Sequence, residues 1–146
     1  MKNVGVIGGG LIGASWAAIF SKSGLNVYVH DSFPSVFDTF IERVTLFLEE
    51  LKSIDPKINI EDSLSRISID VTLEHLCKSV EYIQESAPEI LSVKQELFAK
   101  LDSLAPDHVI IGSSSSAMPI SSITQNLKGQ HRCCLLYTSD AADEFG

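Results

Sequence analysis

The fold is decided near the start of the chain by the stretch Val4-Gly5-Val6-Ile7-Gly8-Gly9-Gly10-Leu11-Ile12-Gly13. Its first four residues are apolar and largely β-branched, which is typical of a strand buried on both faces of a parallel sheet. From Leu11 to Ser23 apolar residues recur at helical spacing, and Gly24 then supplies the residue that ends many helices. The stretch therefore predicts a buried strand, a glycine-rich turn and a helix in direct succession.

The glycines Gly8, Gly10 and Gly13 satisfy the pattern G-x-G-x-x-G between a predicted strand and a predicted helix. The first permits a tight turn, the second lets a pyrophosphate approach the backbone, and the third lets helix and strand pack closely. The amides of Leu11 and Ile12 then face an anion along the helix dipole. We expect these five residues to bind a dinucleotide. FAD enzymes share the pattern, and a glycine turn without a ligand is the other alternative.

Asp31 ends a second predicted strand, Val27 to Val29, and follows Gly8 by 23 positions. An acid roughly 20 residues after the first glycine hydrogen-bonds the adenosine ribose of NAD. A carboxylate there repels the additional phosphate of NADP, and the following Ser32-Phe33-Pro34 offers no arginine to receive it. The sequence therefore favours NAD as the cofactor, the alternative being that Asp31 is a surface residue without a ligand.

Strands and helices alternate through the rest of the chain. The predicted elements are a helix from Pro34 to about Ile54 with an apolar stripe from Phe37 to Leu51, a strand at 67–69, a helix at 72–79 capped by Thr72, a strand at 80–84, a helix at 89–104 with Ile90, Val93, Leu97 and Leu101 on its apolar face, and a strand at 109–111. Alternation of this kind gives right-handed crossovers and a mainly parallel sheet. We predict an α/β fold of the doubly wound Rossmann type.

Composition excludes several classes of partner. The formal charge is −8 and no cluster of Lys and Arg occurs, which excludes DNA and RNA as main partners. The chain has neither a secretory signal pattern nor an apolar run of the roughly 18 residues that span a bilayer, so we expect a cytoplasmic protein with no membrane partner. The three cysteines and four histidines have no metal-ligand spacing, and we expect no metal.

The end of the chain, from Cys134 to Glu144, changes character abruptly and resembles the in-frame translation of a transposase sequencing adapter. Non-native sequence is excluded from fold reasoning. We therefore expect residues 1–133 to form one nucleotide-binding domain and residues 134–146 to be a non-native tail. The alternative is a natural acidic tail.

Several motifs occur in an order that resembles a known family. They are the glycine turn, Ser15-Trp16-Ala17, Asp31, Gln84-Glu85, Pro88-Glu89 and Ser113 to Ser116. From Asn3 to about Cys133 the chain resembles the NAD-binding N-terminal domain of the 3-hydroxyacyl-CoA dehydrogenases. Within that family it is most similar to the branch of L-gulonate 3-dehydrogenase and lambda-crystallin.

The resemblance implies roles for individual residues. Leu11, Ile12 and Asp31 match the family's NAD contacts. Glu89 and Lys94 match a glutamate and a lysine that border the nicotinamide half of the cofactor, and Ser116 matches a serine placed near the nicotinamide and the substrate hydroxyl, which makes it the catalytic candidate. Alternatively, Glu89 caps the first turn of the predicted helix, Lys94 is a solvated lysine and the serines form a local turn.

The family's catalytic pair, a histidine in a His-Pro-x-Asn-Pro-like segment and a later glutamate, is expected beyond Cys133 and is missing. His131 lies too early and lacks that context. The family's helical C-terminal domain, which usually carries a homodimer interface, is also missing. We expect a fragment that binds NAD without turnover, from an enzyme that transfers hydride from a 3-hydroxy acid or 3-hydroxyacyl-CoA, as in fatty acid metabolism. Acyl-CoA, sugar acid and carnitine remain open as substrates, and a non-catalytic or crystallin-like structural protein is the alternative.

Overall fold

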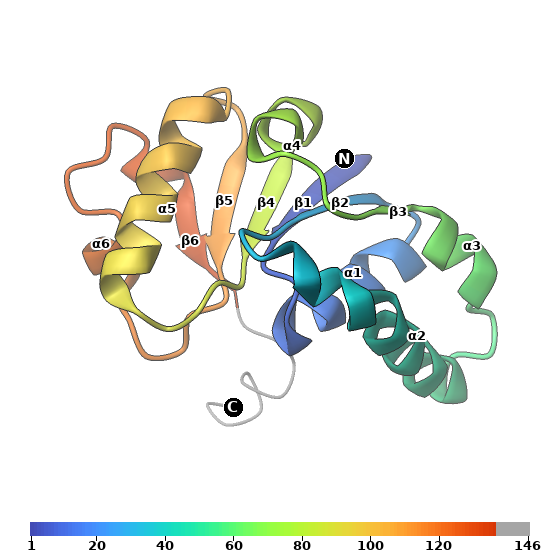
Figure 1. Cartoon of the computed structure of the whole chain (residues 1–146). Coiled ribbons are helices and arrows are strands. Elements are labelled where there is room, and N and C mark those ends of the chain that lie inside the picture. Colours follow the sequence, from blue (N-terminus) through green and yellow to red (C-terminus); the bar gives the residue numbers. More distant parts are fainter. Residues whose placement is uncertain (137–146) are drawn as a thin grey trace.

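The computed structural model describes residues 1–136, which form a six-stranded sheet with helices on both faces (Figure 1). The strands are β1 (Asn3–Ile7), β2 (Asn26–His30), β3 (Ile67–Ser68), β4 (Tyr82–Glu85), β5 (Ile110–Ser113) and β6 (Cys133–Leu135). The helices are α1 (Leu11–Lys22), α2 (Phe37–Ile54), α3 (Ile60–Ser65), α4 (Leu73–Ser79), α5 (Leu91–Leu104) and α6 (Ile120–Ile123). The predicted α/β, doubly wound class is confirmed.

The strand order is β3-β2-β1-β4-β5-β6, and all neighbouring strands are parallel. The order therefore reverses between β1 and β4, where the chain crosses from one half of the sheet to the other. In open parallel sheets this reversal leaves a crevice beyond the carboxyl ends of the strands, and ligands bind there. The segments that follow β1, β2, β4 and β5 all lie at this edge.

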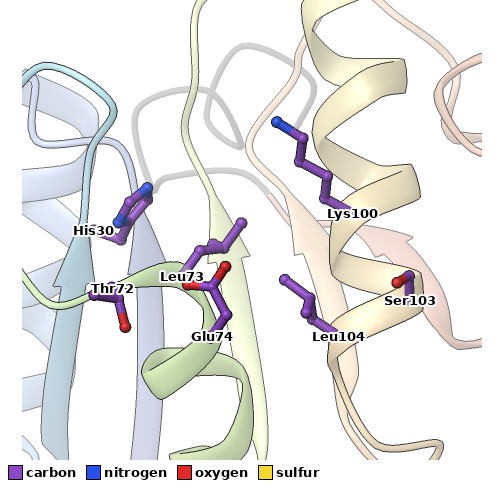
Figure 2. Close-up of a pocket in the computed structure, with 7 residues that line it drawn as sticks. All are labelled: His30, Thr72, Leu73, Glu74, Lys100, Ser103 and Leu104. Carbon is purple, nitrogen blue, oxygen red and sulfur yellow. The ribbon is translucent and has the colours of Figure 1, made fainter.

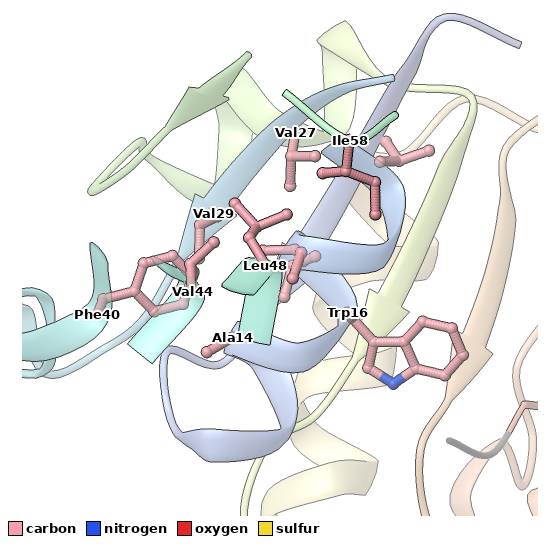
Figure 3. Packing of buried hydrophobic residues seen from close by; sticks show 12 residues of the cluster. Ala14, Trp16, Val27, Val29, Phe40, Val44, Leu48 and Ile58 are labelled. Carbon is pink, nitrogen blue, oxygen red and sulfur yellow. The ribbon is translucent and has the colours of Figure 1, made fainter. Parts of the chain in front are cut away.

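Two hydrophobic clusters hold the helices on the sheet. The first joins α1 and α2 to β1 and β2, and Figure 3 shows Val29, Phe40, Val44 and Leu48 gathered between helices and sheet, with the Trp16 indole at one end. The second joins α4 and α5 to the sheet and includes Leu76, Ile83, Phe98, Leu101 and Ile111. Each helix layer therefore buries one face of the strands that carry the crevice.

Helix α2 confirms its predicted stripe. Phe40, Val44 and Leu48 recur every four residues and are fully buried, because this spacing places them on one face of the helix against the first cluster. The helix itself begins at Phe37, after a short 3₁₀ helix at Pro34–Val36. It packs on α1.

Helix α5 differs from its prediction in start and in face. It begins at Leu91 with Ile90 as N-cap, so Glu89 precedes the helix instead of lying in its first turn. The predicted face is also wrong in part, because Ile90 and Val93 are exposed while Lys94 is fully buried beside Phe98 and Leu101. An ion pair holds Lys94 inside, and an apolar pattern does not reveal such a pair.

Strand β6 pairs with β5 in parallel and runs through Leu135, so the first two residues assigned to the predicted tail continue the sheet. The remaining part of that tail, from residue 137 onward, lies outside the described residues. Within residues 1–136, none of the helices is long and apolar enough to cross a membrane.

Candidate cofactor site

The glycine turn connects β1 to α1 and depends on two close approaches. Gly8 adopts φ +109° and donates its amide to the carbonyl of His30 at 2.8 Å. A Cβ atom on Gly13 would lie 1.8 Å from the carbonyl oxygen of Gly8, so only glycine fits where the helix meets the turn. Both glycines thus have a structural role that the pattern predicted.

Gly10, the second glycine of the pattern, faces open space. A Cβ atom built on it would meet nothing within 4 Å, and none of the described side chains caps α1 at this residue. The first amides of a helix lack acceptors within the helix. Leu11 and Ile12, which carry two of them, are 61% and 45% exposed. The turn therefore leaves room and donors for an anion, which fits the pyrophosphate of a dinucleotide.

Asp31, directly after β2, both closes the turn and faces the crevice edge. Its Oδ2 accepts from the amide of Gly9 at 2.7 Å, and its Oδ1 accepts from the amide of Phe33 at 2.8 Å. Each carboxylate oxygen has two lone pairs, so each keeps one for a further donor. Asp31 can therefore accept from two ribose hydroxyls while it holds Gly9 in place.

A buried ion cluster lies beyond the ends of β4 and β5. Lys94 Nζ is 2.6 Å from Glu85 Oε2, and both side chains are fully buried. The ammonium also donates to the carbonyl of Ala87 at 3.0 Å and pairs with Glu89 Oε1 at 3.2 Å. The same Glu85 oxygen accepts from the amide of Ala87 at 2.6 Å. The sequence analysis singled out Glu89 and Lys94 and gave Glu85 no role in the site.

The cluster limits what Lys94 can bind directly. An ammonium has three protons, and Glu85 and Ala87 accept two of them, while Glu89 Oε1 lies 3.2 Å from the nitrogen as an ion-pair partner. Of the two carboxylates, the Glu89 side chain is 46% exposed, whereas that of Glu85 is buried. A ligand would therefore reach Lys94 from the side of Glu89. The solvated-lysine alternative is excluded.

The serines from Ser113 to Ser115 are held alternately from two sides. Ser113 Oγ donates to Glu85 Oε1 at 2.6 Å, and Ser115 Oγ donates to Glu89 Oε2 at 2.8 Å. Ser114 lies toward α1, where its Oγ accepts from the indole Nε1 of Trp16 at 3.1 Å.

Ser116, the predicted catalytic serine, lies in the loop after β5 and is exposed. Its hydroxyl makes no hydrogen bond with the part of the chain that the structure describes. It is thus on the same sheet edge as the ion cluster, and available to a ligand.

A cavity of about 550 Å³ lies elsewhere, between α4 and α5. Figure 2 shows His30 and Thr72 on one side of the cavity and Lys100 and Leu104 of α5 on the other, with Leu73 between them. None of the predicted site residues lines it. The cavity borders the glycine turn through His30, whose carbonyl accepts from the amide of Gly8.

Glu85, Ser113 and Ser115 belong to motifs that the sequence singled out, but no role was predicted for them in the site. One signal was present, because Glu85 is a charged residue at the carboxyl end of an otherwise buried strand, where ligand sites form. No group of three or more His, Cys, Asp or Glu side chains within residues 1–136 is arranged to hold a metal ion.

The fold and the turn geometry define a dinucleotide-binding α/β domain. Residues 3–139 match the family described as 3-hydroxyacyl-CoA dehydrogenase, NAD binding domain. The chain belongs to this family, and its cofactor is NAD. The family resemblance and the cofactor predicted from the sequence are confirmed.

Individual relatives agree with this assignment. Lambda-crystallin of Oryctolagus cuniculus is 32% identical over 135 residues, which cover 90% of this chain and 42% of that protein. L-carnitine dehydrogenase of Streptomyces coelicolor is 32% identical over 122 residues, which cover 82% of this chain and 37% of that protein. The structure of 3-hydroxybutyryl-CoA dehydrogenase from Escherichia coli K12 has a TM-score of 0.86 at 24% identity, over 97% of this chain and 30% of that one. The chain thus spans less than half the length of these proteins.

Proposed function

We propose that the chain binds NAD along the carboxyl edge of its sheet. The pyrophosphate would lie on Gly8, Gly10 and Gly13, against the amides of Leu11 and Ile12. The proposal is carried by the geometry of Asp31. The amides of Gly9 and Phe33 fix its carboxylate, and each oxygen keeps one lone pair that can accept from a ribose hydroxyl.

The nicotinamide half would then extend over the other side of the sheet. In this fold the dinucleotide crosses the point of strand reversal, so the half opposite Asp31 lies beyond β4 and β5. Glu89 and Lys94 border that region, and Ser116 lies exposed beside it. We assign Glu89 and Lys94 to the cofactor and Ser116 to the oxygen of the substrate.

The whole protein would be an NAD-dependent dehydrogenase acting on a small 3-hydroxy acid or its CoA thioester. NAD supplies the hydride acceptor, and this chain's residues hold and orient it. The family and the similarity to dehydrogenases support this proposal.

Calorimetry on the full 146-residue chain tests the cofactor proposal. We expect NAD to bind at least about tenfold more tightly than NADP, because a ribose phosphate would lie against the Asp31 carboxylate. FAD serves as a further competitor and should not bind. Absence of NAD binding, or a preference for NADP, would contradict the proposal.

A second candidate is a non-catalytic, NAD-binding structural protein of the crystallin kind, which the 32% identity to lambda-crystallin favours. The two candidates differ in turnover and not in cofactor binding. The whole protein, assayed for NADH formation from 3-hydroxy acids, would separate them, because a structural protein binds NAD without forming NADH.

A further inference from the structure

Ser114 is the centre of a polar cluster on the α1 side of the sheet edge. Its Oγ lies 3.1 Å from Trp16 Nε1, 2.7 Å from Gln84 Nε2 and 2.9 Å from Ser86 Oγ. The cluster thereby joins α1 to the ends of β4 and β5. It contains none of the residues assigned to the cofactor above.

The orientation of the Gln84 amide is fixed by its other neighbours. Its Nε2 lies 3.1 Å from the carbonyl of Leu136, a main-chain acceptor that does not depend on the side chain at that position. Its Oε1 accepts from the hydroxyl of Tyr82, and burial raises the pKa of that phenol, which keeps it protonated. Gln84 therefore presents a donor to Ser114.

The direction of the remaining hydrogen bond follows from these donors. A serine hydroxyl has two lone pairs and one proton. Trp16 and Gln84 both donate, so they use the two lone pairs of Ser114, and the proton of Ser114 must go to Ser86 Oγ. The proton of Ser86 itself has no acceptor among residues 1–136.

Ser86 lies where a dinucleotide would cross the sheet. It directly follows β4, it is half-buried, and a Cβ atom on Gly8 would lie 2.6 Å from its carbonyl oxygen. The gap between the ends of β1 and β4 is the point of strand reversal. A ligand that runs from the glycine turn toward Glu89 passes this gap.

We propose that the Ser86 hydroxyl donates a hydrogen bond to an acceptor oxygen in the nicotinamide riboside half of the bound dinucleotide. Trp16 is a positioning residue in this arrangement, because its indole proton prevents Ser114 from accepting the proton of Ser86. The inference rests on the proposed function, since it requires NAD in the crevice.

Calorimetry on the full chain with NAD and with AMP, which carries only the adenosine half, tests the proposal. We expect Ser86→Ala to weaken NAD binding about three- to tenfold, the range of one neutral hydrogen bond, and to leave AMP binding unchanged. Ser103→Ala, an exposed serine on α5, is the matched control and should change neither. Thermal unfolding of each variant records whether the fold is kept.

A double-mutant cycle tests the role of Trp16. Trp16→Phe frees a lone pair on Ser114, which then accepts the proton of Ser86. We expect this variant to weaken NAD binding in the unaltered chain and to have no further effect in the Ser86→Ala background.

Three results would overturn the proposal: unchanged NAD affinity in Ser86→Ala, an equal loss of AMP affinity, or additive effects of the two substitutions. If the unaltered chain did not bind NAD at all, the proposed function would fail, and this inference with it. Normal NAD binding by Ser86→Ala would overturn the inference alone.

Discussion

Lys94 Nζ lies 2.6 Å from Glu85 Oε2, and neither side chain is exposed to solvent. The two residues come from different elements, Glu85 from the end of β4 and Lys94 from the first turn of α5. Without Glu85 the buried ammonium would keep the half-exposed Glu89 as its ionic partner, and the loss of one member of a buried pair costs far more than the pair itself contributes. The pair therefore ties the stability of α5 to the sheet edge that carries the site.

We expect Glu85→Gln to lower the free energy of unfolding by about 3–5 kcal/mol, measured by urea denaturation. The double variant Glu85→Gln with Lys94→Met should lose less than the sum of the two single variants, because it leaves no unpaired charge. Lys100→Met on the same helix is the control. Lys100 forms an exposed pair with Glu96 at 3.8 Å, and its loss should change the free energy of unfolding by less than about 1 kcal/mol. Additive losses would contradict a coupled buried pair.

Alanine at two glycines should separate folding from binding. Gly13→Ala should lower the free energy of unfolding by about 3 kcal/mol, because its Cβ would collide with the Gly8 carbonyl. Gly10→Ala should keep stability within about 0.5 kcal/mol, since its Cβ enters open space. That Cβ would occupy the position of the pyrophosphate and should weaken NAD binding at least about tenfold. Thermal unfolding and calorimetry measure both effects. NAD affinity unchanged in Gly10→Ala would argue against the proposed position of the phosphates.

Asp31→Asn should alter cofactor choice. Loss of the carboxylate removes two charge-assisted acceptors for the ribose, and we expect NAD affinity to fall about tenfold or more. The affinity for NADP should fall less, because the substitution also removes the repulsion between the carboxylate and the additional phosphate of NADP. Calorimetry with NAD and with NADP gives the ratio of the two affinities. Asp38→Asn, an exposed acid in the first turn of α2, is the matched control. The same NAD to NADP ratio in both variants would contradict the role of Asp31.

Stability should fall between about pH 9 and pH 11. Burial raises the pKa of the Cys77 thiol from 9.0 to about 11. In this range the unfolded chain releases the thiol proton while the folded chain keeps it, so rising pH favours unfolding. Cys77→Ala should flatten the dependence of the melting temperature on pH. Cys134→Ala, at an exposed cysteine, should flatten it less. An unchanged slope in Cys77→Ala would contradict the burial of this thiol.

The sequence predicted the elements whose signals are local. The glycine turn, the strand before it and the helix after it are confirmed, and so is Thr72, whose hydroxyl caps α4 by accepting from the amide of His75. Residue spacing and capping residues suffice to predict these elements, because the interactions that form them join residues only a few positions apart.

The remaining features depend on partners that sequence spacing does not show. Lys94 was predicted as a cofactor contact or, alternatively, a solvated lysine, but its side chain is buried because the Glu85 carboxylate pairs with its ammonium. The start of α5 was placed too early, since Pro88 enters a turn in which the amide of Ile90 donates to its carbonyl. In the site, the contacts of Glu89, Lys94 and Ser116 with cofactor and substrate stay predictions.

Three of the four serines in the run are anchored on alternating sides, which makes the number of residues in the run as important as their chemistry. Ser113 and Ser115 bind the carboxylates of Glu85 and Glu89, and Ser114 binds the indole of Trp16. Deleting one residue from the run would barely change its composition, yet it would shift the following residues to the opposite side. The following Ala117 would then take the place of the exposed Ser116. A single-codon deletion here would therefore be more damaging than most substitutions within the run.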